Sequence, residues 1–223
     1  MLICGKEITL FPGRAADAPL VVLHTDGEEA ARIVKLIQEE TEADFALAAV
    51  AGVDWDRDMS PWPIDPVFRG GPAYAGGADA YLARLTGELL PALERAGYLA
   101  PRARYLAGYS LAGLFALYAL TRTGVFTRAA SVSGSLWYPG WPAYLQEHLP
   151  SPLPERVYLS LGDREARTRN PSLRPVEDNT RAAEELFRRA GVPVRFELNP
   201  GNHFQQPEER TARGIAWLVG EEG

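Results

Sequence analysis

The chain has 223 residues, 46% hydrophobic and 23% charged, a composition typical of a globular protein with one substantial core. Its formal net charge of -6 argues against a nucleic-acid partner, and its single cysteine, Cys4, excludes an intrachain disulfide and a multi-cysteine metal site. The N-terminus lacks a basic segment followed by a long apolar one, and no run approaches about 18 apolar residues. We therefore expect a single domain over residues 1–223, soluble, cytoplasmic and without a membrane partner.

Strand-like and helix-like segments alternate along the chain, beginning with a strand or hairpin at residues 2–10 in which Cys4 is an inert strand residue. Further strands are predicted at 20–24, 44–52, 103–107, 129–133, 157–161 and 194–198, and helices at 27–41, 79–96, 111–123, 176–190 and near the C-terminus. A long loop rich in proline, tryptophan and glycine separates two of these segments at 53–77. The alternation predicts an α/β fold with a mostly parallel central sheet and helices on both faces.

Ser110 lies between an apolar strand candidate and a helix candidate, in the sequence Gly-Tyr-Ser-Leu-Ala-Gly at 108–113. A sharp strand-to-helix turn exposes a serine hydroxyl and aims the first N–H groups of the helix at one point. The turn needs small residues on both sides, and Gly108 and Ala112 meet this requirement, although the usual pattern G-x-S-x-G has a second glycine where Ala112 stands. Taken alone, the motif is as consistent with a chance match as with a nucleophile.

Other reactive side chains follow later strands. Asp163 and Glu165 come directly after the strand at 157–161, and His203 follows the strand at 194–198. Functional groups gather at the carboxyl ends of parallel strands, and the order serine, acid, histidine is that of α/β-hydrolases. We predict that Ser110 attacks an acyl carbonyl, that His203 is the general base and acid, and that Glu165 or Asp163 orients the imidazole.

Several motifs along the chain resemble those of one family. They are the run 76–81 (GGADAY), the serine motif at 108–114, the run 131–137 (SVSGSLW), the run 162–165 (GDRE) and the run 201–204 (GNHF). Together they resemble the esterase D-like group of α/β-hydrolases, which includes siderophore esterases, feruloyl esterases and mycolyltransferases. The resemblance implies an α/β-hydrolase fold and acyl-ester chemistry, accommodates Ala112, and favours Glu165 over Asp163 because the group often has glutamate in a Gly-x-x-Glu position.

The tetrahedral intermediate of acyl transfer needs N–H donors for its oxyanion. One donor is expected to be the backbone N–H of Leu111, the residue after the nucleophile. The second is expected from Gly27 or Glu28, in the loop after the strand at 20–24. The pair Asp26-Gly27 is also compatible with a plain turn that caps the next helix.

Substrate contacts are less strongly indicated. Trp137 and Tyr138 could line an aromatic pocket, or they could pack in the core. Arg57 could hold an anionic group, or it could form an ion pair within its own loop. The arginines at 164, 167 and 169 could bind a carboxylate, or they could form a solvated face.

The histidines outside the predicted triad are assigned structural positions: His24 is expected to be packed and His148 to lie on the surface. No His-x-x-x-His, Cys-x-x-Cys, G-x-G-x-x-G or P-loop pattern is present, so neither a metal nor a nucleotide cofactor is expected. The sequence thus favours a cofactor-independent serine esterase that acts on a small-molecule carboxylic ester. The alternatives are an acyltransferase with the same triad and a catalytically silent binding protein.

Overall fold

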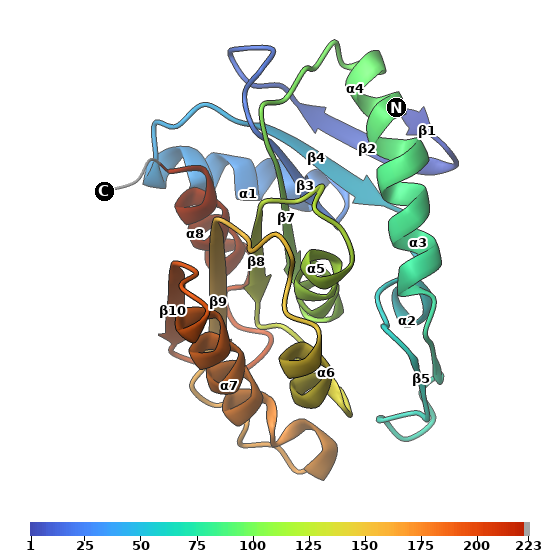
Figure 1. The fold of residues 1–223 in the computed structure, drawn as a ribbon, viewed down its shortest axis with the longest axis vertical. Coiled ribbons are helices and arrows are strands. Elements are labelled where there is room, and N and C mark those ends of the chain that lie inside the picture. The colour runs from blue at the N-terminus through green and yellow to red at the C-terminus, as the bar shows by residue number, and fades with distance from the viewer. Residues whose placement is uncertain (221–223) are drawn as a thin grey trace.

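A computed structural model describes residues 1–220 and contains an eight-stranded sheet with the order β1-β2-β4-β3-β7-β8-β9-β10 (Figure 1). The strands are β1 (Leu2–Ile3), β2 (Lys6–Phe11), β3 (Leu20–Leu23), β4 (Ala46–Ala51), β7 (Arg104–Tyr109), β8 (Arg128–Val132), β9 (Arg156–Gly162) and β10 (Val194–Asn199). All neighbours from β4 to β10 run parallel, whereas β2 pairs antiparallel with both β1 and β4. The predicted mostly parallel α/β sheet is confirmed.

Helices cover both faces of the sheet. On one face, α1 (Gly27–Glu40) and α8 (Pro207–Val219) pack over alternate side chains of the central strands. The other face carries α3 (Ala78–Arg84), η1 (Leu85–Leu89), α4 (Leu90–Ala96), α5 (Leu111–Arg122), α6 (Trp141–Glu147) and α7 (Val176–Arg189). Because successive side chains of a strand point to opposite faces, the sheet contributes to two separate apolar cores.

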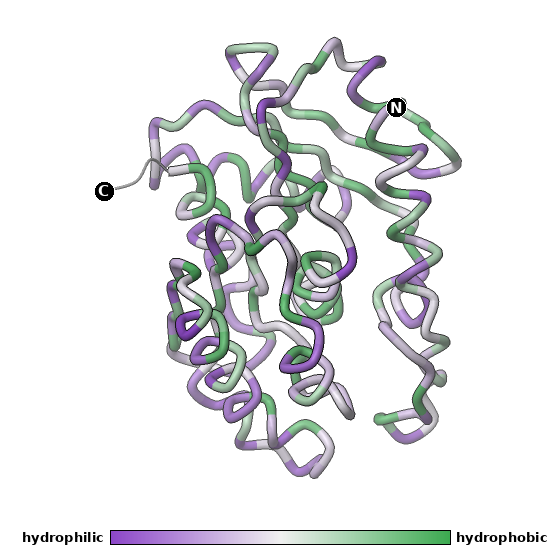
Figure 2. The backbone as a smooth tube through the Cα atoms, in the orientation of Figure 1, coloured by the Kyte–Doolittle hydropathy of each residue, from purple (hydrophilic) through white to green (hydrophobic). Residues whose placement is uncertain are grey.

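The helix that follows Ser110 is apolar on all sides. Every residue of α5 from 112 to 120 is buried, and in Figure 2 the colour of α5 is more hydrophobic than that of α7. A helix of this kind is stable only inside the protein, where it packs on β7 and β8. The nucleophile candidate therefore stands at the start of a rigid, buried element.

The segment at 53–77 is less irregular than its composition predicts. It contains α2 (Trp55–Asp58) and a two-stranded ribbon of β5 (Pro63–Ile64) and β6 (Tyr74–Ala75). A separate 3₁₀ turn, η2 (Pro171–Leu173), precedes α7. Ser60 ties the segment together, because its hydroxyl accepts the Gly76 N–H at 2.8 Å and donates to the Asp56 carbonyl at 2.7 Å. The ribbon thus has a fixed place beside α2 (Figure 1).

The prediction that Cys4 is a strand residue is wrong. Cys4 lies between β1 and β2 with φ of 48°, and Gly5 beside it has φ of 75°. These left-handed conformations reverse the chain, so the thiol stands exposed in the hairpin turn. In the part of the chain that the structure describes, no helix is long and apolar enough to cross a membrane.

His24, predicted to be packed, is 3% exposed and contacts the rings of Tyr81 and Phe115. Burial, with a smaller effect from the Lys6 ammonium, lowers the pKa of His24 to about 3. The folded protein therefore excludes a proton that the unfolded chain binds below about pH 6.5, so acid favours unfolding by about 1.4 kcal/mol per pH unit between those two pKa values.

We expect the His24→Gln variant to lose about 2 kcal/mol less unfolding free energy than the wild type does when the pH falls from 7 to 5. Urea denaturation at the two pH values measures this difference. The matched control is His148→Gln, which removes an exposed histidine and should leave the wild-type pH dependence in place. Equal losses in the wild type and His24→Gln would contradict the prediction.

Candidate active site

Ser110 occupies the sharp turn between β7 and α5, with φ of 57° and ψ of -122°. Its N–H donates to the Val132 carbonyl at 3.1 Å, and its carbonyl accepts the Ser135 N–H at 2.9 Å. A Cβ at Gly108 would lie 2.3 Å from the Ala112 backbone, so glycine is required there, whereas the small Ala112 side chain is accommodated. The turn therefore tolerates alanine at the second small position but not at the first.

Ser110, His203 and Glu165 are connected by hydrogen-bonding distances. The His203 Nε2 lies 3.1 Å from the Ser110 Oγ, and the His203 Nδ1 lies 2.7 Å from the Glu165 Oε2. The Tyr109 hydroxyl donates to the His203 carbonyl at 2.5 Å, which fixes the loop that follows β10. This arrangement can move a proton from the serine to an imidazole held by a carboxylate.

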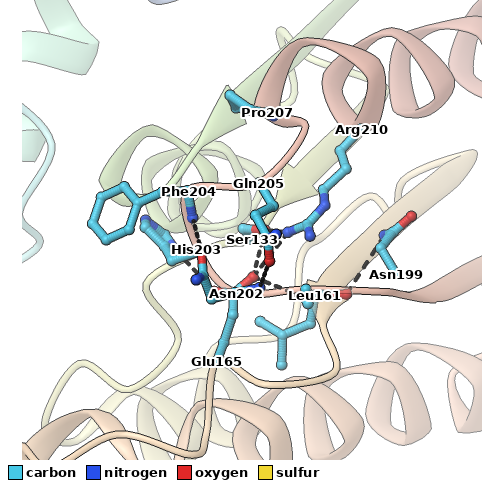
Figure 3. A network of polar contacts seen from close by, with 12 residues as sticks. Ser133, Leu161, Glu165, Asn199, Asn202, His203, Phe204, Gln205, Pro207 and Arg210 are labelled. Carbon is cyan, nitrogen blue, oxygen red and sulfur yellow. Dashed lines mark hydrogen bonds and ion pairs between the residues drawn. The ribbon is translucent and has the colours of Figure 1, made fainter.

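The second oxygen of Glu165 is held by donors from three parts of the fold. The Glu165 Oε1 accepts hydrogen bonds from the Ser133 hydroxyl at 2.8 Å, the Gly162 N–H at 2.7 Å and the Arg210 Nη1 at 3.2 Å. Figure 3 shows Arg210 reaching this carboxylate from α8, beside Ser133. Arg210 is fully buried, and its Nη2 also donates to the Pro200 carbonyl at 3.1 Å.

These contacts determine the charge of the acid. Burial alone would raise the pKa of Glu165, but the hydrogen bond and charge of His203, with the bonds from Gly162 and Ser133, hold that pKa below its ordinary value. The carboxylate is therefore ionised at neutral pH and can stabilise a positive charge on His203.

Asp163 has a different environment. Its Oδ1 accepts the Gly201 N–H at 2.8 Å and lies 3.9 Å from the Arg164 Nε, and its side chain is 46% exposed. This bond joins the turn after β9 to the loop that carries His203. The structure thus brings Glu165, and not Asp163, to the imidazole.

Of the predicted oxyanion donors, the structure places Leu111 at the cavity of Ser110 and places Gly27 and Glu28 away from it. Leu111 is the first residue of α5 and lines the same cavity as Ser110, so its N–H is one of the free donors at a helix start. Neither Gly27 nor Glu28 lines this cavity. A Cβ at Gly27 would lie 2.4 Å from the Thr9 Oγ1 on β2, and Asp26 caps α1 through the Glu29 N–H at 2.8 Å, so this segment serves as a helix-capping turn.

A cavity of about 740 Å³ opens at Ser110 and His203. Its apolar walls come from Phe68, Tyr74, Trp137 and Phe204. This volume and lining suit a small organic molecule with an apolar or aromatic part.

Two of the predicted substrate contacts lie away from this cavity. Tyr138 is fully buried and donates to the Trp62 carbonyl at 2.6 Å, so it belongs to the core, whereas its neighbour Trp137 lines the cavity. Arg57 does not line the cavity: its Nε lies 2.9 Å from the Asp58 Oδ1 and its Nη1 lies 3.6 Å from the Asp54 Oδ2. Arg57 thus forms the ion pairs within its loop that the sequence left as the alternative.

Sequence reasoning missed three side chains around Ser110, His203 and Glu165. Ser133 and Arg210 bind Glu165, and the Ser135 Oγ lies 3.4 Å from the Ser110 Oγ. Both serines belong to the run 131–137, which the sequence singled out only as a family motif. Nothing in the local sequence distinguishes Arg210 from Arg213, the other arginine of α8. Within residues 1–220, no group of histidine, cysteine, aspartate and glutamate side chains could hold a metal ion.

The strand order, the turn at Ser110 and the helices on both faces define an α/β-hydrolase fold. The family model "Esterase", described as "Putative esterase", matches residues 11–206, and the chain belongs to this family of carboxylic ester hydrolases. The resemblance to the esterase D-like group and the prediction of an esterase are confirmed.

Individual relatives are more distant in sequence. The chain is 23% identical over 191 residues to the uncharacterized protein YbbA of Bacillus subtilis (strain 168). This alignment covers 82% of this chain and 76% of YbbA. It is also similar in structure to an IroE-like serine hydrolase from Shewanella oneidensis, with a TM-score of 0.79, 18% identity, and coverage of 96% of this chain and 75% of that one. The siderophore hydrolase EstA from Aspergillus nidulans aligns with a TM-score of 0.68 and 20% identity, covering 92% of this chain and 84% of that one.

Proposed function

We propose that this esterase cleaves a small-molecule carboxylic ester through an acyl-enzyme on Ser110, with His203 as general base and acid and Glu165 as the residue that orients it. The observation that carries the proposal is the continuous chain of contacts from the Ser110 Oγ through His203 to Glu165, at 3.1 Å and 2.7 Å. These three residues line a cavity of about 740 Å³, a size that suits a small-molecule ester.

In the first half of the reaction, His203 takes the Ser110 proton while the Oγ attacks the ester carbonyl. The negative charge that forms on the carbonyl oxygen is stabilised by the Leu111 N–H at the start of α5, where the helix dipole adds to the effect. His203 then passes its proton to the departing alcohol oxygen, and the C–O bond breaks.

In the second half, a water molecule attacks the acyl group on Ser110, and His203 takes a proton from that water. The acid product leaves when the proton returns to the Ser110 Oγ. Glu165 stays ionised throughout, because Arg210 and the Gly162 N–H stabilise its negative charge.

A fluorophosphonate probe tests the nucleophile directly. We expect the wild type to form one covalent adduct, which peptide mass spectrometry places on Ser110, and to hydrolyse a short p-nitrophenyl ester. The heat-denatured protein is the control, since labelling must depend on the folded triad. A folded wild type that neither reacts with the probe nor cleaves the ester would refute the proposal in favour of a silent binding protein. Measuring, in the presence of an added alcohol, how much of the acyl group appears as free acid and how much as a new ester separates hydrolysis from acyl transfer.

A further inference from the structure

One wall of the catalytic cavity is basic. Arg164, Arg167 and Arg169 all line it, all are exposed, and all belong to the connection between β9 and α7 that also carries Glu165. The Arg164 Nη2 donates to the Gln205 Oε1 at 2.9 Å. Within residues 1–220, the side chains of Arg167 and Arg169 make neither an ion pair nor a hydrogen bond, so two positive charges line the cavity without an ion-pair partner. Glu165 also lines the cavity, but its charge is paired with Arg210.

The cavity also has an acidic group from a different part of the fold. Asp56 of α2 lines it, is partly buried, and forms no ion pair with any residue from 1 to 220. In Figure 1, α2 and β5 lie on one side of α5, and α7 with the connection leading into it lies on the other. The cavity is therefore electrostatically asymmetric: an anionic group is stabilised near the arginines and repelled near Asp56.

The catalytic geometry relates the basic wall to one part of an ester. His203 must give its proton to the departing alcohol oxygen, so the alcohol part of the substrate lies beside the imidazole. Glu165, which binds that imidazole, is the next residue after Arg164, and Arg164 binds Gln205, two residues beyond His203. Arg164 therefore adjoins the side of the cavity that the alcohol part would occupy, and Arg167 and Arg169 line the cavity from the same connection.

We propose that the preferred substrates are esters whose alcohol part carries a carboxylate, which Arg167 and Arg169 bind. This inference rests on the proposed serine esterase function. A guanidinium presents a planar pair of donors that matches a carboxylate, and such charge-assisted hydrogen bonds are stronger than neutral ones. The apolar walls at Phe68 and Trp137 would contact the uncharged remainder of the molecule.

Four esters form two matched pairs that test the proposal. Phenyl acetate and 3-acetoxybenzoate differ by a carboxylate on the alcohol part, and phenyl butyrate and phenyl hydrogen succinate differ by a carboxylate on the acyl part. We expect kcat/KM for 3-acetoxybenzoate to exceed that for phenyl acetate by about tenfold at low ionic strength, since exposed arginines are partly screened. We expect no such gain for phenyl hydrogen succinate over phenyl butyrate.

The double variant Arg167→Gln/Arg169→Gln identifies the groups responsible. In it, the ratio of kcat/KM for 3-acetoxybenzoate to that for phenyl acetate should fall close to one. The charge-matched control, Arg188→Gln/Arg189→Gln, removes two exposed arginines that pair with Glu184 and Glu185 on α7, and should keep the wild-type ratio. In the wild type, raising NaCl from about 0.05 M to about 0.5 M should also reduce the ratio.

Three results would overturn the inference: a wild-type ratio near one, a ratio retained in the Arg167→Gln/Arg169→Gln variant, or a preference for phenyl hydrogen succinate instead. Phenyl acetate separates this failure from that of the underlying function. A wild type that hydrolyses phenyl acetate but ignores the carboxylate refutes only the specificity, whereas one that hydrolyses none of the four esters and resists the fluorophosphonate refutes the esterase mechanism.

Discussion

Replacing Ser110 by alanine is expected to lower kcat for a short p-nitrophenyl ester by about 10⁵-fold or more, because no acyl-enzyme can form without the Oγ. The residual rate would come from binding and oxyanion stabilisation, which do not need the nucleophile. Steady-state kinetics measure the loss, and the fluorophosphonate adduct should disappear with it. Thermal unfolding by circular dichroism should show that the fold persists, since alanine removes only an oxygen at this position.

Ser135 provides the matched control for this substitution. Its Oγ lies 3.4 Å from the Ser110 Oγ and it lines the same cavity, yet it forms no hydrogen bond with His203. The Ser135→Ala variant should keep covalent labelling at Ser110 and most of the esterase activity. If Ser110→Ala retained labelling while Ser135→Ala lost it, the nucleophile would be the second serine, and the proposed mechanism would be wrong.

The elements that the sequence predicted well are those determined by local patterns. The turn at Ser110 depends on small residues at fixed positions, and the Gly108 and Ala112 contacts show why that spacing is readable in sequence. The buried strands and the apolar α5 likewise follow from continuous hydrophobic runs. Strand ends that meet at one edge of a parallel sheet then indicate which distant residues lie near each other.

The sequence left alternatives open where two adjacent residues point in different directions. Trp137 lines the cavity while Tyr138 enters the core, and no periodic pattern in a loop distinguishes them. Gly27 follows the expected strand, but the Asp26 cap starts α1 at once and turns the glycine toward Thr9 on β2. Such outcomes depend on how a helix leaves the sheet, which the sequence of the loop alone does not determine.

Long-range polar contacts were equally inaccessible. Arg210 is 45 residues beyond Glu165 in the chain, and its role becomes visible only when α8 packs on the sheet and buries the guanidinium completely. From the sequence, an arginine on an amphipathic helix is expected to be solvated. The buried charge is stable here because the ionised Glu165 accompanies it.

The choice between Glu165 and Asp163 yields the second large effect. We expect Glu165→Gln to lower kcat about 10⁴-fold, because both oxygens of the carboxylate accept hydrogen bonds and an amide can accept at only one end. The amide oxygen should turn to the Gly162 N–H and Arg210, which leaves the NH₂ group facing His203. The imidazole would then have to accept at Nδ1 and carry its proton on Nε2, where it cannot take the proton of Ser110.

Asp163→Asn is the matched control, since its remaining side-chain oxygen can still accept the Gly201 N–H that Asp163 binds at 2.8 Å. This variant should keep kcat near the wild-type value, because Asp163 forms neither a hydrogen bond nor an ion pair with the imidazole. Measuring kcat and thermal unfolding for both variants separates a catalytic loss from a structural one. A large loss of kcat in Asp163→Asn together with near-normal activity in Glu165→Gln would show that the imidazole is oriented by the aspartate in the working enzyme, and the loop after β9 would then have to rearrange when substrate binds.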